Sequence, residues 1–84
     1  MTKSVFSARY AKFRKLLTDA RLAANLTQDG LAARLGRPQS YVSKYERGER
    51  RLDVVEFLEI ARVLRIDSSD ILTQLEAVTE VDPE

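Results

Sequence analysis

The chain has 84 residues, a length that corresponds to one domain with a single core. It contains no cysteine and no histidine, which excludes disulfides, thiolate zinc sites and histidine-based catalytic pairs. Its net charge is +1, and no apolar run is long enough to span a membrane. The sequence therefore predicts a protein with no metal, no cofactor and no membrane partner. Residues 1–9 lack the hydrophobic core of a signal peptide, which indicates a cytoplasmic protein.

Charge is distributed unevenly along the chain. Residues 1–51 contain twelve Lys and Arg against four Asp and Glu, a net charge of +8, whereas residues 52–84 carry −7. This asymmetry is typical of a protein that presents a basic face to a polyanion. Chance clustering on solvated helix faces is the alternative explanation.

The first helix is expected from about Ala8 to Ala24. Ser7 is suited to cap its start, and Asn25 can end it in the left-handed conformation. Apolar residues at intervals of three and four share one face of this segment, namely Tyr10, Phe13, Leu17, Ala20 and Ala24.

Two short helices follow, joined by a tight turn. Thr27 is expected to cap the first, which ends near Leu35, and Gly36 can adopt the positive φ that the turn requires. Pro38 fits the first turn of the second, which runs to about Arg47.

Two more helices are expected in the acidic part of the chain. Asp53 and Glu56 match the pattern of a capping box for a helix that continues to about Leu64. Asp67 can cap a last helix over residues 68–78. No segment alternates with the period of a strand, so the predicted fold class is all-α, a compact five-helix domain. This domain is expected over residues 8–78, between a flexible basic N-terminal arm at 1–7 and a frayed acidic tail at 79–84.

The two short helices carry the pattern that indicates a function. Helices joined by so short a turn cross steeply, and their contact needs small or branched residues such as Ala32 and Val42. With Val42 and Tyr45 facing inward, the opposite side of the second short helix is almost wholly polar. That side carries groups suited to base edges and phosphates, namely Gln39, Ser40, Ser43, Lys44 and Arg47. An ordinary solvated face is the alternative interpretation.

Several fixed spacings occur together in this chain: Leu26-Thr27-Gln28, Leu31-Ala32, Leu35-Gly36, Gln39, Val42-Ser43, Tyr45-Glu46, Gly48, Ile60-Ala61 and Leu64. With this pattern, residues from about 10 to 78 resemble the Cro/repressor-type (XRE) helix-turn-helix family, whose members are mostly DNA-binding transcriptional regulators. The resemblance implies a lambda-repressor-like DNA-binding fold. It also implies a sequence-specific, repressor-like regulator of transcription that binds double-stranded DNA.

The resemblance also implies roles for individual residues. Contacts to bases are implied for Gln39, Ser40, Tyr41, Ser43 and Lys44. Packing against the neighbouring helix is an equally good interpretation of Tyr41. Contacts to the DNA backbone are expected for Gln28, Arg37, Arg47, Arg50 and Arg51. Arg21 and Glu46 match positions that form a structural ion pair beneath the DNA-binding surface.

The expected last helix carries an apolar stripe made of Ile71, Leu72, Leu75 and Val78. In a five-helix domain the final helix covers only one edge of the core, so part of the stripe should remain open to a second copy. This predicts a two-fold homodimer that reads both halves of a palindromic operator. The alternative is that all four residues complete the core of the monomer.

An enzyme and a protein-interaction module are the two alternatives to DNA binding. An enzyme is not expected, because the common nucleophile–base pairs are missing. A protein-interaction module of the same fold, such as an antitoxin that binds a partner protein, is the second rival. It is favoured by the apolar content of the C-terminal third, which includes Val54, Val55, Phe57, Leu58 and Ile60.

Overall fold

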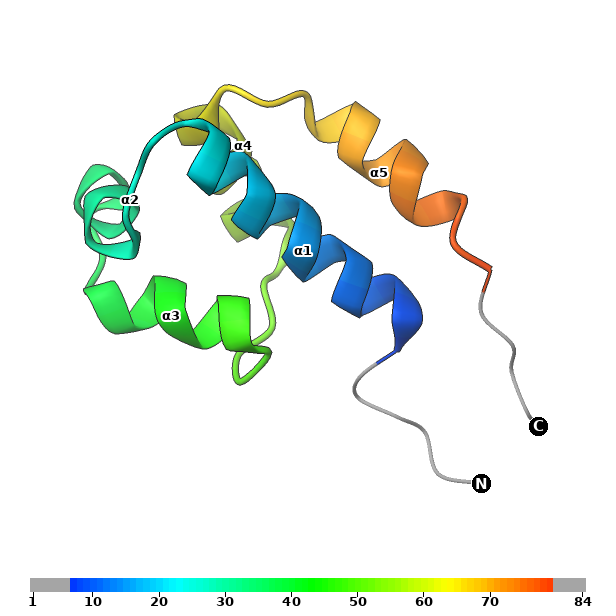
Figure 1. Cartoon of the computed structure of the whole chain (residues 1–84), viewed down its shortest axis with the longest axis horizontal. Helices are drawn as coiled ribbons and strands as arrows, with labels where there is room; N and C mark the ends of the chain where they lie inside the picture. Colours follow the sequence, from blue (N-terminus) through cyan, green and yellow to red (C-terminus); the bar gives the residue numbers. More distant parts are fainter. Residues whose placement is uncertain (1–6, 80–84) are drawn as a thin grey trace.

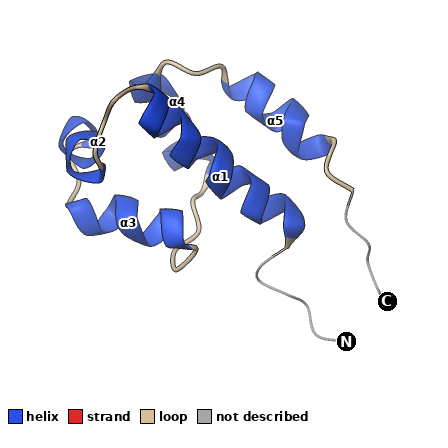
Figure 2. Cartoon of the chain, in the orientation of Figure 1, coloured by secondary structure: helices blue, strands red, loops and turns tan. Residues whose placement is uncertain are grey.

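The structure, a computed structural model, describes residues 7–79. This part of the chain is all-α, as predicted, and Figure 2 shows its helices joined by short loops without a strand. Within it, no helix is both long enough and apolar enough to cross a membrane. The expected N-terminal arm and acidic tail lie outside the described residues, apart from positions 7 and 79. The helices are α1 (Ala8–Ala23), α2 (Gln28–Leu35), α3 (Gln39–Arg47), α4 (Val54–Leu64) and α5 (Ser68–Glu76).

Side-chain caps fix the starts of four of these helices. Ser7 accepts a hydrogen bond from the amide of Tyr10, and Thr27 accepts one from the amide of Gly30. Asp67 caps α5 through the amide of Ser69. At α4 both bonds of the predicted capping box are present, since the side chains of Asp53 and Glu56 each accept from the other's amide. These caps satisfy amides that would otherwise have no partner within the helix.

The helix α3 begins one residue later than predicted. Pro38 has an extended backbone, with a ψ of 154°, and precedes the first helical residue. It therefore provides no side-chain cap. Its fixed φ of −65° still suits the entry into the helix.

Left-handed residues end the helices where the sequence indicated. Gly36 ends α2 with a φ of 70°, and Asn25 follows α1 with a φ of 59°. A Cβ atom on Gly36 would meet nothing within 4 Å, so the positive φ, not crowding, is what favours glycine there. Arg65 ends α4 with a φ of 59°, which the sequence did not indicate. The helix α5 stops at Glu76, two residues before the predicted end.

The helix α1 lies at the centre of the molecule (Figure 1). It contacts α3 on one side and α5 on the other, while α2 packs against α3 and α4. Every helix contributes to one core, which consists of Phe13, Leu17, Leu31, Ala32, Tyr41, Val42, Tyr45, Phe57, Ile60, Ala61, Leu64 and Ile71.

The inner face of α1 differs from the predicted one at its C-terminal end. Ala24 is exposed, and Arg21 is buried one turn after Leu17. Helical spacing allowed either residue to continue the face. The arginine is buried because it has an acidic partner on α3, described below.

Candidate nucleic-acid interface

The angle between α2 and α3 is filled by three buried side chains. Ala32 of α2 is 2% exposed, while Val42 and Tyr45 of α3 are 0% and 1% exposed. The small side chain of Ala32 allows the helices to approach, as predicted from the sequence. With these residues inward, the opposite side of α3 is directed to solvent. Its exposed residues are Gln39, Ser40, Lys44 and Arg47.

Two residues predicted to contact bases are buried instead. Ser43 is 8% exposed, and its hydroxyl lies 3.3 Å from the carbonyl oxygen of Ser40. Tyr41 is 7% exposed and packs edge-on against Tyr45, with ring centroids 5.6 Å apart. Neither side chain is open to a ligand in this structure, and contacts of both with bases stay predictions. For Tyr41 the burial agrees with the alternative interpretation that its ring packs inside the protein.

A chain of hydrogen bonds links α1 to the outer side of α3. Arg21 binds both carboxylate oxygens of Glu46, with distances of 2.8 Å from Nε and 3.0 Å from Nη2. The Glu46 oxygen Oε1 also accepts from Nε2 of Gln28 at 3.0 Å. The Gln28 oxygen in turn accepts from Nε2 of Gln39 at 3.0 Å. The buried ion pair thus holds a glutamine of α2, and that glutamine holds the first residue of α3.

These hydrogen bonds fix the orientation of the side-chain amides of Gln28 and Gln39. The carboxylate of Glu46 can only accept, so the NH₂ group of Gln28 must face it. The side-chain oxygen of Gln28 then accepts a hydrogen bond from the side-chain NH₂ group of Gln39. Gln39 is left with its carbonyl oxygen and one N–H at the exposed start of α3. One acceptor beside one donor is the set that pairs with N6 and N7 of adenine in the major groove.

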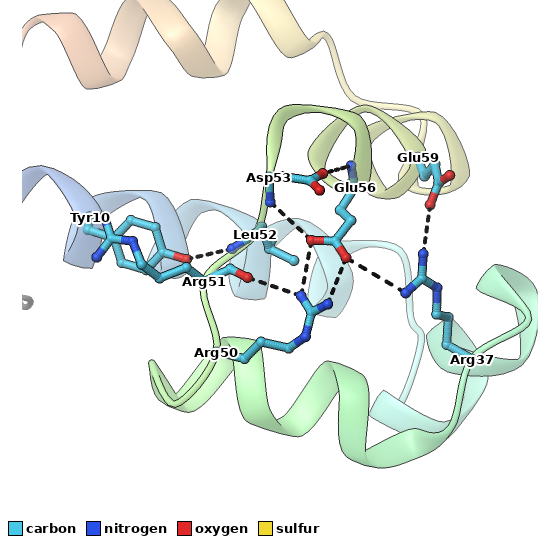
Figure 3. A network of polar contacts seen from close by, with 8 residues as sticks. All are labelled: Tyr10, Arg37, Arg50, Arg51, Leu52, Asp53, Glu56 and Glu59. Atoms are coloured by element: carbon cyan, nitrogen blue, oxygen red, sulfur yellow. Dashed lines mark hydrogen bonds and ion pairs between the residues drawn. The ribbon is translucent and has the colours of Figure 1, made fainter.

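Four arginines expected at the DNA backbone have partners within the protein. Arg50 forms a bidentate pair with Glu56, at 3.0 and 2.8 Å, and Arg37 lies 3.7 Å from the same carboxylate. Figure 3 shows Glu56 between these two arginines. Arg47 pairs with Glu49 at the exposed end of α3, and the guanidinium of Arg51 lies 4.2 Å from the centre of the Tyr10 ring. Exposed pairs are weak, so the Arg47 pair can be exchanged for a phosphate at little cost.

The sequence identified Glu56 only as a capping residue. The structure shows that the same carboxylate also joins two arginines from different loops. Hydrogen bonds from Arg50 and from the amide of Asp53 lower the pKa of Glu56 from its ordinary value of 4.5 to about 2. No regular spacing signals this role, because Arg37 precedes α3 and Arg50 follows it.

The lowered pKa predicts how stability depends on pH. A carboxylate whose pKa is lower in the folded state contributes stability that is fully present above about pH 4.5. This contribution is lost as the pH falls toward 2. We therefore expect urea unfolding to show a larger loss of stability between these pH values in the parent than in Glu56→Gln. Glu59→Gln, which changes an exposed carboxylate of the same helix, should follow the parent. Parallel curves for the parent and Glu56→Gln would contradict the prediction.

The apolar stripe of α5 is divided between the core and the surface. Ile71 is 6% exposed and belongs to the core, which agrees with the alternative that it completes the core of the monomer. Leu72 is 50% exposed, and Leu75 and Val78 are partly buried. Arg9 of α1 anchors the C-terminal end of α5 and the residues after it, because its guanidinium donates hydrogen bonds to the backbone carbonyl oxygens of Leu75 and Val78.

The exposed part of the stripe continues onto α4. Leu72 and Leu75 line a hollow of about 350 Å³ together with Val54 and Phe57 of α4 and with Tyr10 and Phe13 of α1. Val54 is 71% exposed, and Leu58, one turn further along α4, is 48% exposed. We call Val54, Leu58, Leu72 and Leu75 the α4–α5 apolar surface. From the sequence we expected residues near the end of α4 to join the open stripe, whereas Val54 at its start lines the hollow with Leu72 and Leu75.

Comparison with known proteins agrees with this geometry. Residues 17–71 match the family model described as "Helix-turn-helix". The chain is 56% identical to an XRE-family like protein from Pseudomonas syringae pv. tomato str. DC3000, over 86% of this chain and 88% of that one, with a TM-score of 0.80. A comparison with curated proteins gives no match.

Two solved controller proteins are also similar. The restriction-modification controller protein C.AhdI from Aeromonas hydrophila is 36% identical over 76% of this chain and 97% of that one, with a TM-score of 0.69. The controller protein C.Esp1396I, solved as a tetramer in complex with its natural 35 base-pair operator, is 24% identical. That match covers 84% of this chain and 93% of that one, and its TM-score of 0.73 shows the same fold.

The fold and the arrangement of α2 and α3 define a helix-turn-helix protein. The chain belongs to the XRE-type helix-turn-helix family, as its sequence pattern indicated. This is a family of DNA-binding transcriptional regulators, not a class of enzymes.

Proposed function

We propose that this protein is a repressor-like regulator of transcription that binds a palindromic operator in double-stranded DNA as a homodimer. The helix α3 enters the major groove and reads bases with Gln39, Ser40 and Lys44. Contacts to the DNA backbone come from Gln28, Arg37, Arg47, Arg50 and Arg51. The controller protein C.AhdI, which is 36% identical, is a regulator of the same fold.

The observation that carries this proposal is the hydrogen-bond chain that ends at Gln39. A buried ion pair holds Gln28, which holds the amide of Gln39 with one donor and one acceptor exposed. A solvated surface residue has no need of such support. An amide oriented before binding loses less side-chain entropy when it meets a base, which favours recognition of a defined sequence.

Dimerisation follows from the size of the reading surface. One short helix reads only about four or five base pairs, so a single copy cannot select one site in a genome. Two copies related by a dyad read half-sites about 34 Å apart on one face of the duplex. The α4–α5 apolar surface supports this pairing, because Val54, Leu58 and Leu72 remain exposed in the monomer.

Selection of bound duplexes from a random pool, followed by affinity measurements across a range of salt, tests DNA binding. A plot of log affinity against log salt should have a slope steeper than about −3, because several phosphates are neutralised. Gln39→Ala should weaken binding to the selected duplex by about 1–3 kcal/mol and leave binding to an unrelated duplex nearly unchanged. Arg51→Ala should weaken binding to the two duplexes by the same factor, which makes it the matched control. A salt plot without a slope would refute DNA binding. If Gln39→Ala binds the selected duplex as tightly as the parent does, base recognition by α3 is refuted.

A protein partner is the second candidate, and the exposed side chains of α4 favour it. Val55, which is not part of the α4–α5 apolar surface, is 63% exposed and is available to a partner. A chain that functions only through a partner should show no salt-dependent retention on duplex DNA. The salt experiment therefore separates the two candidates.

A further inference from the structure

Glu56 lies where three parts of the proposed DNA-binding surface meet. It caps α4, its carboxylate binds Arg50 of the loop after α3, and it approaches Arg37 of the turn before α3. Its side chain is only 12% exposed, whereas those of Arg37 and Arg50 are 34% and 39% exposed. The carboxylate is thus largely covered, and the two guanidinium groups remain open to an outside ligand.

The two arginines are also anchored to α3 through an aromatic ring. The Cζ atoms of Arg37 and Arg50 lie 4.5 and 4.9 Å from the centre of the Tyr41 ring. Tyr41 is buried in α3, so this ring fixes the arginines relative to the helix that is proposed to enter the groove. A phosphate bound by either arginine is therefore held in a fixed position relative to α3.

The geometry of the Arg50–Glu56 pair leaves a complete donor edge of the guanidinium unused. Nη1 and Nη2 of Arg50 each bind one oxygen of Glu56, and Nη1 also donates to the carbonyl of Arg51. This is an end-on pair. The opposite edge, formed by Nε–H and the second N–H of Nη2, has no acceptor among residues 7–79. Two parallel N–H groups are the arrangement that binds a phosphate bidentately.

Arg47 provides a contrast. Its Nε and Nη2 both bind Glu49, at 2.9 and 3.0 Å, so this carboxylate occupies the edge that a phosphate would need. Both partners are about half exposed, with side-chain exposures of 54% and 53%. Glu49 therefore competes with a phosphate for its arginine, whereas Glu56 leaves the phosphate-binding edge of Arg50 free.

We propose that Glu56 is a positioning residue for DNA: it holds the end-on edge of Arg50 so that the side-on edge is presented to a backbone phosphate. The inference rests on the proposed DNA binding and adds the residue that organises this contact. Because Arg50 is ordered before binding, it loses less side-chain entropy when the phosphate arrives. Glu56 itself touches no DNA.

Two variants that remove the same charge test this inference. Glu49→Gln and Glu56→Gln each delete one negative charge beside the proposed interface, which alone strengthens DNA binding. We expect Glu49→Gln to bind a duplex selected from a random pool about twofold more tightly. We expect Glu56→Gln to bind it about fivefold more weakly, because the NH₂ group of glutamine cannot accept from Nη2 of Arg50 and the bidentate pair is lost. Glutamine preserves the capping bond to the amide of Asp53, so α4 should keep its start.

A double-mutant cycle with Arg50→Ala measures the coupling directly. Arg50→Ala should weaken binding about tenfold in the parent and only about twofold in the Glu56→Gln background. It should also reduce the salt slope by about 1 in the parent and by less in that background. Arg50→Lys, which keeps the charge but lacks the fork, should cost nearly as much as Arg50→Ala. This variant tests the geometry without changing Glu56.

Three results would overturn the inference. Tighter binding by Glu56→Gln would show that Glu56 competes with the phosphate, as Glu49 does. Full activity of Arg50→Lys would show that charge alone is sufficient. Equal effects of Arg50→Ala in both backgrounds would show that Arg50 acts independently, while DNA binding itself would stand. A parent protein that binds no duplex would refute the proposed function together with this inference.

Discussion

Arg21→Ala is expected to lower the free energy of unfolding by about 3–5 kcal/mol, although Arg21 lies beneath the proposed DNA-binding surface and not on it. The side chains of Arg21 and Glu46 are 10% and 6% exposed, and two hydrogen bonds join them. Removal of the arginine leaves a buried carboxylate whose remaining side-chain partner is the neutral amide of Gln28. It also removes the bond from Nη1 of Arg21 to the carbonyl of Leu26, which connects α1 to the following turn.

The size of this effect is large for so short a chain. At about 0.05–0.15 kcal/mol per residue, an 84-residue domain has a total stability of roughly 4–12 kcal/mol. Loss of 3 kcal/mol would lower the melting temperature by about 12 °C or more. The hydrogen bond to Glu46 raises the pKa of Arg21 above its usual value, so the guanidinium keeps its positive charge in the folded protein.

Urea unfolding of matched variants measures the prediction. Lys15→Ala removes another cation of α1, whose pair with Asp19 is exposed, and it should cost less than about 1 kcal/mol. The double variant Arg21→Met/Glu46→Met should regain most of the stability, because apolar residues of similar volume can replace a buried pair. An unchanged melting temperature of Arg21→Ala would contradict the buried pair.

The double variant also separates stability from recognition. Without Glu46, the amide of Gln28 is no longer oriented, and Gln39 loses its support. A stable double variant with weakened selectivity for the selected duplex is therefore expected. This outcome would show that the buried pair serves recognition more than stability.

The helices and their ends were accessible from the sequence because they depend on local chemistry. The caps at Ser7, Thr27 and Asp67 act on amides within the next three residues, and Gly36 determines its own φ. Such interactions involve neighbours in the chain, so their residue types are visible in order. The left-handed Arg65 was missed because its residue type does not favour that conformation.

The site was predicted less completely, because its residues are arranged by tertiary contacts. The outward side of α3 was expected to include Ser43, but neighbouring elements cover that position. The apolar pattern of α5 holds as far as Leu75, whereas Val78 lies beyond the end of the helix. The spacing could not tell that Ile71 faces α1 while Leu72 faces solvent, because that depends on how α5 lies across the core. Glu56 joins Arg37 and Arg50, which lie 19 and 6 residues before it, and no periodic pattern relates such positions.

Leu72→Glu is expected to convert the proposed dimer into a folded monomer and to weaken operator binding by about 100-fold or more, equivalent to about 2.7 kcal/mol. Leu72 is 50% exposed and lines the same hollow as Val54 of α4 and Leu75 of α5. In a two-fold interface the same residue occurs twice, so one substitution introduces two charges at the contact. Both must lose water on association, which opposes the contact between the two copies.

The design of this experiment depends on the distinction between Leu72 and its neighbours. Ile71 is in the core, and Leu75 is partly buried, so a charge at either position would destabilise the monomer itself. Leu22 of α1 is 57% exposed and lies outside the surface, which makes Leu22→Glu the matched control. Sedimentation at tens of micromolar should give a dimer for the parent and for Leu22→Glu, and a monomer with unchanged helix content for Leu72→Glu.

A monomeric parent would contradict the interface whatever the variant does. A dimeric Leu72→Glu would show that the interface does not include this face of α5. If Leu72→Glu is monomeric but binds the operator as tightly as the parent, each copy binds DNA independently, and the palindromic operator is refuted.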